Sequence, residues 1–266
     1  MIIGKKVLGD EPHIWGILNV TPDSFSDGGK FENMDDALFQ AEKMVAAGAE
    51  IIDVGGMSTR PGHSEVPDDI EAERVCPVIR AIKERLNVII SVDTYKSSVA
   101  AAAADAGAEL INDISGLTID KKMPGLVAKR DLSVCLMHLT GRTEDLSVME
   151  SCKKGLSDSI DIALSAGIEK DRIIIDPGIG FGWNTKENLE AIKNIGELQE
   201  LGYPVLFGIS RKSVIGNTLR LSVDDREEGT IALNLYGLSK GVNHFRVHDV
   251  EKNMRAIKMW MAVENV

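Results

Sequence analysis

The sequence predicts an α/β fold, a single (β/α)8 barrel (TIM barrel) that spans residues 1–266 as one domain. Short apolar, β-branched runs alternate with longer helical patterns along the whole chain. The runs are apolar almost throughout, which is typical of parallel strands buried on both faces. No Ser/Pro-rich linker and no shift in composition divides the chain, and its 266 residues are close to the ~250 of a usual barrel of this kind.

Eight strands are expected from these runs. The structural alternative, a doubly wound open sheet, predicts fewer strands and usually a glycine fingerprint after the first one. That fingerprint is missing, because the dense glycine motif at residues 178–182 has the wrong spacing and follows the sixth run. The predicted strands are Trp15–Val20, Ile51–Gly55, Val88–Thr94, Leu110–Ile114, Val134–His138, Ile173–Asp176, Val205–Ile209 and His244–Val247.

Helices are expected between the strands. After the first strand, apolar residues from Met34 to Val45 recur at the spacing of one helix face, with Asn33 or Asp35 as the N-cap.

An internal repeat shows where helices end and strands begin. Residues 47–54 read Ala-Gly-Ala-Glu-Ile-Ile-Asp-Val, and residues 106–113 read Ala-Gly-Ala-Glu-Leu-Ile-Asn-Asp. In both, a glycine is expected to end the helix in the left-handed conformation, and a strand follows. The same punctuation recurs at Gly167, Gly202 and Gly241.

Composition excludes several classes of function. With 30 Lys+Arg against 41 Asp+Glu, the net charge of −11 disfavours binding to nucleic acid or to an anionic membrane surface. No apolar run approaches the ~20 residues of a membrane span, and no secretory signal is visible at the start. The odd number of cysteines, without a Cys-x-x-Cys pair, predicts reduced structural thiols in a cytoplasmic protein, with a catalytic cysteine as the lesser alternative. These cysteines are Cys76, Cys135 and Cys152.

Polar residues end most of the apolar runs. In a barrel of parallel strands the chemistry lies at the carboxyl ends of the strands, so these residues are candidates for a site. A single Asp at a strand end is more often an N-cap of the next helix, but caps alone would not require the mixture of Asn, Lys, Arg and His found at the eight strand ends. The residues are Asn19, Asp53, Asp93, Asn112, Asp113, His138 and Asp176.

The last two strand ends carry positive charge. Arg211, Lys212 and Ser213 begin a helix-like segment, and Arg246 and His248 share one face of a strand. Barrels often bind phosphate at these two loops. The sequence therefore predicts an anion site on an acidic protein.

Two other assignments for these residues are less favoured. His244 and His248 lie four apart, which in a strand spans about 13 Å and is too far for one zinc ion. His244 is expected in the core or on the surface. Lys212 is interpreted as an ion partner rather than a Schiff-base lysine.

Two polar, glycine-punctuated loops follow the first and second strands. Residues 21–29 and 55–62 each carry one hydrophobic anchor, Phe25 and Met57 respectively. They are either plain connections or lids over the barrel mouth.

Taken in order, the motifs of the chain resemble those of one enzyme family, dihydropteroate synthase. The resemblance runs from about Trp15 to Asp249 and involves seven of the eight strands. The motifs are Gly16-Ile-Leu-Asn-Val-Thr-Pro-Asp-Ser-Phe-Ser-Asp-Gly-Gly29, Ser58-Thr-Arg-Pro-Gly62, Ser91-Val-Asp-Thr94, Ile111-Asn-Asp-Ile-Ser-Gly116, Asp176-Pro-Gly-Ile-Gly-Phe-Gly182, Ser210-Arg-Lys-Ser213 and Arg246-Val-His-Asp249.

The resemblance implies a pterin-binding (β/α)8 barrel that acts in folate biosynthesis. Such an enzyme joins p-aminobenzoate to 6-hydroxymethyl-7,8-dihydropterin diphosphate, gives 7,8-dihydropteroate and releases pyrophosphate with help from Mg²⁺. It also implies a homodimer and a site where sulfonamides compete as mimics of p-aminobenzoate.

The resemblance also assigns roles to individual residues. The pterin pocket is expected to contain Asp93, Asn112, Met137, Asp176, Phe181 and Lys212. The diphosphate is expected at Asn19, Arg246 and His248, with Asn19 as the Mg²⁺ ligand. The p-aminobenzoate site and its loops are expected to include Phe25, Asp27, Thr59, Arg60, Pro61 and Ser213. The catalytic set is Asn19, Asp93, Lys212, Arg246 and His248.

Two positions depart from the family's pattern. Met57 stands where the family usually has Glu, and Trp183 where it usually has Lys. Two alternatives are kept. A corrinoid-linked pterin methyltransferase domain shares the barrel but should lack the two loops and the Ser-Arg-Lys-Ser cluster. A catalytically silent pterin-binding homologue is suggested by Met57.

Overall fold

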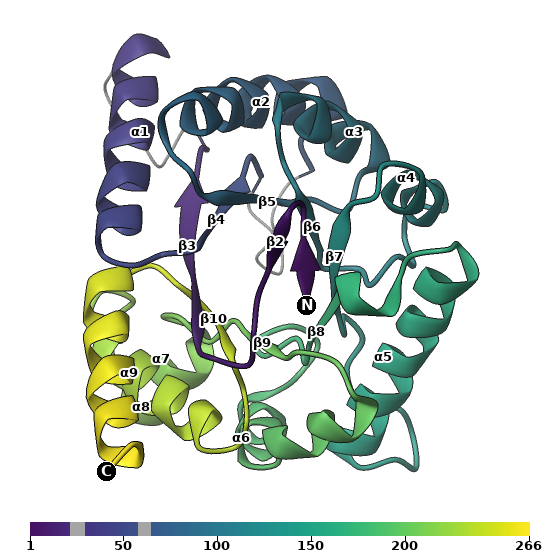
Figure 1. Cartoon of the computed structure of the whole chain (residues 1–266). Coiled ribbons are helices and arrows are strands. Elements are labelled where there is room, and N and C mark those ends of the chain that lie inside the picture. Colours follow the sequence, from purple (N-terminus) through teal and green to yellow (C-terminus); the bar gives the residue numbers. More distant parts are fainter. Residues whose placement is uncertain (22–29, 58–64) are drawn as a thin grey trace.

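The computed structural model describes residues 1–21, 30–57 and 65–266, and within them eight parallel strands form one barrel (Figure 1). The strand order is β8-β7-β6-β5-β4-β3-β10-β9, and a parallel bridge between Ile175 and Val205 joins the two ends of the sheet. The predicted (β/α)8 barrel is confirmed. The barrel strands are β3 (His13–Asn19), β4 (Ile51–Gly55), β5 (Ile89–Asp93), β6 (Leu110–Asp113), β7 (Ser133–Met137), β8 (Ile173–Asp176), β9 (Leu206–Phe207) and β10 (His244–Val247).

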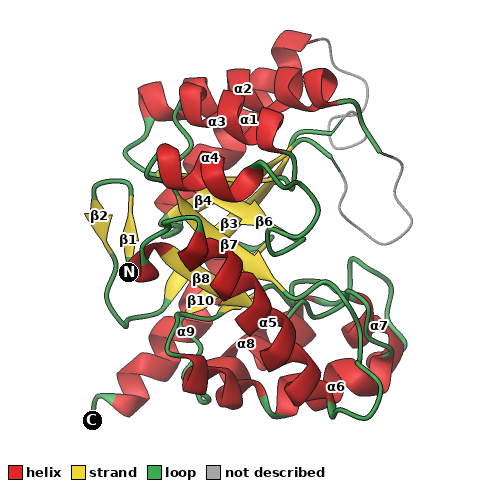
Figure 2. Ribbon diagram, turned by 90° about the vertical axis from the view of Figure 1, so that its right-hand side faces the viewer, coloured by secondary structure: helices red, strands yellow, loops and turns green. Residues whose placement is uncertain are grey.

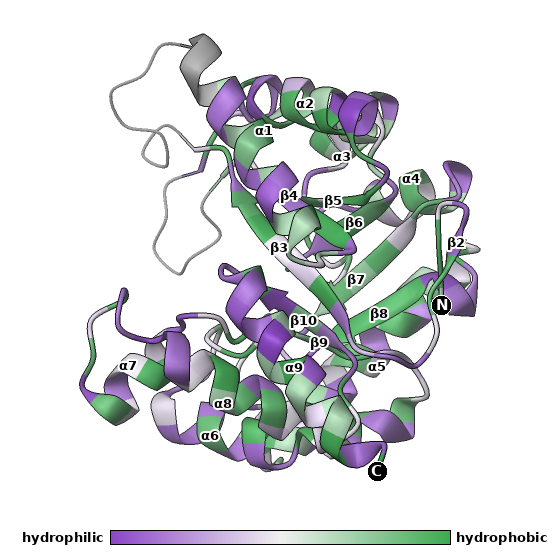
Figure 3. Cartoon of the chain, turned by 60° about the vertical axis from the view of Figure 1, so that its left-hand side comes forward, coloured by the Kyte–Doolittle hydropathy of each residue, from purple (hydrophilic) through white to green (hydrophobic). Residues whose placement is uncertain are grey.

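Each expected strand is present, and the hydrophobic runs mark them well. Figure 3 shows β8 as hydrophobic along most of its length, because it reads Ile-Ile-Ile-Asp and is buried. The largest difference is at β9, which pairs only over Leu206–Phe207 instead of the expected five residues.

Helices surround the barrel and shield its outer face (Figure 2). Capping boxes start two of them, at Ser147 with Glu150 and at Asn184 with Glu187. The helices are α1 (Lys30–Ala46), α2 (Asp68–Arg85), α3 (Ser97–Ala106), α4 (Met123–Lys129), α5 (Val148–Ser165), α6 (Thr185–Lys193), α7 (Ser213–Leu219), α8 (Glu227–Leu238) and α9 (Val250–Glu264), with short 3-10 helices at Lys170–Arg172 and Ile195–Leu201.

One helix boundary differs from the prediction. Helix α1 begins at Lys30, so Asn33 and Asp35 lie within its first two turns and neither caps it. The glycine punctuation is confirmed, because the glycines expected after helices have φ between +72° and +116°. These are Gly48, Gly107, Gly167, Gly202 and Gly241.

A small hairpin that the sequence did not reveal closes one end of the barrel. Strands β1 (Ile2–Ile3) and β2 (Lys6–Val7) pair antiparallel, opposite the end at which α7 lies (Figure 2). Ile3 packs beneath the barrel interior with Trp15 and Leu110. The hairpin seals the amino-terminal end of the barrel, which leaves the carboxyl end for chemistry.

The N-terminal end also holds His244. Its ring is fully buried, accepts a hydrogen bond from Trp15 Nε1 at 3.1 Å and lies 4.9 Å from the His13 ring. The core alternative for His244 is therefore the correct one. Among the described residues no helix is long and apolar enough to cross a membrane.

Candidate active site

The register of the sheet aligns polar residues at the carboxyl ends of four neighbouring strands. Asn19 pairs with Gly55, Gly55 with Asp93, and Asp93 with Asn112. This row of Asn, Gly, Asp and Asn crosses β3 to β6. The side chains that the sequence placed at separate strand ends therefore lie next to one another.

Asp53 lies at the centre of the polar network. It precedes Gly55 by two residues on β4, so it lies one layer deeper in the barrel than this row. Its carboxylate is fully buried and accepts hydrogen bonds from Ser91 Oγ at 2.5 Å, Asn112 Nδ2 at 3.1 Å and Arg246 Nε at 2.5 Å. A buried carboxylate needs such partners to remain charged. Asp53 thereby holds Asn112 and Arg246 in position.

Arg246 bridges two carboxylates. Besides Asp53, it donates from Nη2 to Asp93 Oδ2 at 2.7 Å, while Oδ1 of Asp93 has no hydrogen-bond partner among the described residues. Burial, together with the nearby charges of Asp53 and Glu71, raises the pKa of Asp93 to about 7, although Arg246 opposes the shift. The open Asp93 oxygen is available to a hydrogen-bond donor of a ligand.

A second carboxylate, Asp176, faces Lys212. Asp176 Oδ1 accepts from the backbone N–H of Gly178 at 2.7 Å. Burial raises the pKa of Asp176, and Lys212 counteracts this. Burial likewise lowers the pKa of Lys212 to about 8 against the attraction of Asp176. The pair therefore favours the ion-partner interpretation of Lys212.

Lys212 also touches the loop after β8. Its Nζ donates to the backbone carbonyl of Ile179 and lies 4.7 Å from the centre of the Phe181 ring. This ammonium–aromatic contact ties Phe181 to the start of α7, which Lys212 directly precedes.

An apolar cluster flanks the charged residues. Met57, Tyr95, Ile114 and Met137 are buried against one another, with Phe181 packed on the cluster. Met57 is 3% exposed, so it acts as an apolar anchor. A flat ligand with a polar edge could contact this cluster and the carboxylates at the same time.

Asn19, His248 and Ser213 lie at the edge of the site. Asn19 is exposed at the end of β3. His248 has its Nδ1 2.9 Å from Ser210 Oγ, and its backbone N–H donates to the same oxygen. Ser213 is exposed as the first residue of α7, directly after Lys212.

Five predicted residues lie outside the described part of the chain. These are Phe25, Asp27, Thr59, Arg60 and Pro61.

Several residues singled out in the sequence have structural roles instead. Arg211, expected in the cationic cluster, turns away: its φ is +56° and its Nε pairs with Glu227 at 3.2 Å. Asp113 accepts from the backbone N–H groups of Ser115 and Leu117, so it stabilises the turn after β6 and is not the N-cap of the next helix, α4, which begins at Met123. Burial raises the pKa of all three cysteines, that of Cys152 to about 12, which disfavours a catalytic thiolate.

The sequence named Asp53 as one of the polar strand-end candidates, but the resemblance assigned it no role in binding or catalysis. The available signal was a charged residue inside an otherwise apolar run, Ile51-Ile-Asp-Val-Gly55, where a buried charge requires partners. Those partners come from three other strands, so the sequence could not name them.

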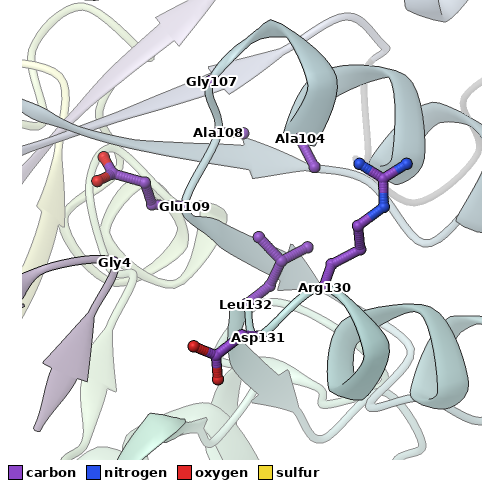
Figure 4. A pocket seen from close by; sticks show the side chains of 8 residues that line it. All are labelled: Gly4, Ala104, Gly107, Ala108, Glu109, Arg130, Asp131 and Leu132. Carbon is purple, nitrogen blue, oxygen red and sulfur yellow. The ribbon is translucent and has the colours of Figure 1, made fainter.

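A hollow of about 310 Å³ lies away from this site, between the N-terminal hairpin, the α3–β6 connection and the α4–β7 connection (Figure 4). Its charged side chains already have partners: Glu109 pairs with Lys83, Arg130 with Asp105, and Asp131 with Arg172. The polar cluster at the carboxyl ends of the strands is therefore the stronger candidate.

Comparison with known proteins identifies the family. Residues 15–248 match the family described as pterin binding enzyme. The chain is 50% identical over 262 residues to the dihydropteroate synthase of Clostridium beijerinckii, with 97% of each chain covered. It is 46% identical over 252 residues to that of Bacillus subtilis, covering 95% of this chain and 88% of the relative.

Solved structures agree with these relatives. A Clostridium difficile dihydropteroate synthase, solved in the presence of pteroic acid, superposes with a TM-score of 0.92 at 49% identity, covering 95% of this chain and 97% of the other. A Yersinia pestis dihydropteroate synthase in complex with a sulfonamide drug gives a TM-score of 0.93 at 39% identity, covering 100% and 99%.

A parallel barrel with a carboxylate-rich, lysine-containing mouth and this family match belongs to the pterin binding enzymes. Within them the chain belongs to the dihydropteroate synthases, which are transferases of folate biosynthesis. The resemblance predicted from the motifs is confirmed.

Proposed function

We propose that the cluster around Asp93, Asp176 and Lys212 binds 6-hydroxymethyl-7,8-dihydropterin diphosphate, and that p-aminobenzoate displaces the diphosphate there to give 7,8-dihydropteroate. The single observation that carries this proposal is the proximity of two opposite charges beside an apolar cluster: the buried Asp176 carboxylate and the half-buried Lys212 ammonium, each of which favours the charged form of the other. The whole chain, residues 1–266, serves as one pterin-binding barrel domain.

The site is complementary to a pterin. The amino-pyrimidine edge of a pterin presents adjacent N–H donors, which Asp176 can accept as charge-assisted hydrogen bonds, while Lys212 donates to the ring carbonyl. Asn112 and Asp93 supply further polar contacts. Met137 and Phe181 would cover the faces of the ring, and both belong to the apolar cluster or pack on it.

The diphosphate fits the cationic corner of the site. Arg246 has two of its three nitrogens engaged by Asp53 and Asp93. The remaining Nη1 group, with His248 and Asn19, faces the leaving diphosphate in our proposal. As the C–O bond to the diphosphate breaks, positive charge grows on the pterin methylene and negative charge on the leaving group. Asp93 stabilises the first, and Arg246 and His248 stabilise the second.

The nucleophile needs little activation. The arylamine of p-aminobenzoate is neutral at pH 7 and is already nucleophilic, so the reaction requires no strong general base. We assign its binding to Ser213 and to the loop residues Thr59, Arg60 and Pro61, with Phe25 and Asp27 from the other loop. Relatives solved with 4-aminobenzoic acid and with a sulfonamide drug support p-aminobenzoate as the second substrate.

We further propose Mg²⁺ as the cofactor, with Asn19 as its protein ligand. Among the described residues no group of three or more His, Cys, Asp or Glu could hold a metal ion. Asn19 fits a site of another kind, because Mg²⁺ commonly takes one or two protein oxygens and completes its shell with water and phosphate. Asn19 is exposed at the end of β3, next to Gly55 of β4, so its side chain is accessible to an ion. When bound, Mg²⁺ would neutralise charge on the diphosphate.

We propose that the protein is a homodimer. Leu189 on α6, Leu219 on α7 and Tyr236 on α8 are each 36% or more exposed. These helices are neighbours, since Asn217 of α7 contacts Thr185 of α6 and Tyr236 of α8 donates to the carbonyl of Lys193 in α6. We propose that this face of the three helices forms the interface between the two subunits. Light scattering is expected to give twice the mass of 28.9 kDa; a monomer would contradict the proposed dimer.

We also propose a cytoplasmic location, because all three cysteines are free.

The test is a pyrophosphate-release assay on the purified protein with Mg²⁺ and both substrates, with dihydropteroate measured by chromatography. We expect release that depends on p-aminobenzoate. Pterin binding without release would instead favour the catalytically silent homologue.

A further inference from the structure

The loop after β8 is held by an aromatic stack that the reaction does not use directly. The Trp183 indole lies on the His138 ring with centroids 5.1 Å apart and planes 29° from parallel. Both side chains are buried, at 7% and 3% exposed. Trp183 Nε1 also donates to the backbone carbonyl of Pro177 at 3.2 Å. Trp183 therefore connects the two ends of residues 177–183 and joins them to the end of β7.

Two backbone segments meet beside this stack without room for side chains. A Cβ at Gly178 would lie 1.9 Å from the His138 carbonyl oxygen, and one at Gly182 would lie 2.6 Å from the Gly141 nitrogen. Both glycines have positive φ, +71° and +64°. The segment after β7 and the segment after β8 therefore pack backbone against backbone.

Asn188 holds the same segment from the side of α6. Its Oδ1 accepts from the backbone N–H of Gly180 at 2.7 Å, and its Nδ2 donates to the carbonyl of Trp183 at 3.0 Å. Asn188 is 2% exposed. The segment 177–183 is thus fixed at its middle and at its end.

This segment carries three groups of the candidate site. The N–H of Gly178 donates to Asp176, the carbonyl of Ile179 accepts from Lys212, and the Phe181 ring lies beneath the Lys212 ammonium. A shift of the segment would move all three together.

We propose that Trp183 and His138 are positioning residues for pterin binding: their stack sets the place of the segment that orients Asp176, Phe181 and Lys212. The inference rests on the proposed function in taking a pterin as the ligand of those residues. Neither aromatic ring needs to touch the substrate.

The test compares variants at position 183. Trp183→Leu removes the stack and the hydrogen bond, whereas Trp183→Phe keeps an aromatic ring on His138. We expect Trp183→Leu to raise both the KM for the pterin diphosphate and the Kd for 6-hydroxymethylpterin about 10-fold, with the KM for p-aminobenzoate within about two-fold. Trp183→Phe should recover most of this loss. Trp260→Leu, on the outer helix α9, is the matched control and should change neither constant.

Melting temperatures show whether each variant is folded, and Trp183→Met replaces Trp183→Leu if the latter does not fold. Unchanged pterin binding in a folded Leu or Met variant would overturn the proposal. An equal rise in both KM values would do so too, because it would indicate general loosening. The 6-hydroxymethylpterin titration requires no turnover. If the wild type binds this pterin but releases no pyrophosphate, the proposed function fails while the positioning role is still tested.

Discussion

Arg246 donates to Asp53 at 2.5 Å, across a separation of 193 residues in the chain. The same guanidinium reaches Asp93, so one arginine links the second, third and eighth barrel strands. Buried ion pairs of this kind are weak evidence for stability but fix geometry. In this site Arg246 fixes the position of the Asp93 carboxylate, which in the proposed function faces the reacting methylene of the pterin.

Removing the charge of Asp53 should disturb this geometry. For Asp53→Asn we expect kcat/KM to fall about 100-fold, the scale of a misplaced reacting group. The pKa of Asp93 should also fall, because Asp53 helps to raise it. The acidic limb of the pH–rate profile should then move to lower pH. Asp113→Asn, another buried carboxylate, is the control and should leave that limb in place; an unmoved limb in Asp53→Asn would contradict the proposed coupling.

Replacing Asp93 by Asn should have opposite effects on stability and on activity. Its pKa is raised to about 7 in the folded protein, so the folded state binds more protons than the unfolded state between pH 4 and 7. Stability from this group therefore falls as pH rises through that window. Asp93→Asn should be more stable than the wild type at pH 8, by on the order of 1–2 kcal/mol, yet should lose activity. Urea unfolding at pH 5 and pH 8 measures the difference, and equal effects at both pH values would refute it.

Lys212 is expected to act on the pterin. Lys212→Ala should raise the KM for the pterin diphosphate at least about 10-fold, because a charge-assisted hydrogen bond is lost. The neighbouring Arg211→Ala is the matched control: Arg211 pairs with Glu227, so its loss should lower the melting temperature with little change in this KM. A larger effect from Arg211 would reverse the assignment.

Arg60 and Ser213 are expected to act on p-aminobenzoate. Arg60→Ala should raise the KM for p-aminobenzoate about 10-fold and Ser213→Ala by less, because Ser213 brings only a neutral hydroxyl. A sulfonamide should inhibit in competition with p-aminobenzoate. Steady-state kinetics with each substrate varied in turn decide the matter, and competition with the pterin diphosphate would contradict the division of roles.

The Mg²⁺ dependence of pyrophosphate release should change when Asn19 is replaced. Chelation by EDTA should abolish pyrophosphate release, and Asn19→Ala should raise the Mg²⁺ concentration for half-maximal rate about 10-fold. Asn265→Ala, an exposed asparagine after α9, is the control. If Asn19→Ala shows the wild-type Mg²⁺ dependence, another group holds the ion.

The hydrophobic pattern determined the fold. Parallel strands buried on both faces must be apolar along their length, so each strand was visible as a run such as Ile173–Asp176. The glycines that follow five of the helical segments were visible for a similar local reason, the cost of a Cβ at positive φ. The hairpin of β1 and β2 was not visible, because two-residue strands carry no period.

The sequence also determined that polar residues gather at one end of the barrel, and its motifs indicated the family. Only the tertiary structure decided how those residues are connected. Asp53 was expected at a strand end but had no predicted role, because its partners Ser91, Asn112 and Arg246 come from three other strands. Arg211 was misplaced because its backbone turns it toward Glu227. Local patterns fix which face of a strand a residue occupies, whereas hydrogen-bond partners depend on the register between strands that are distant in the chain.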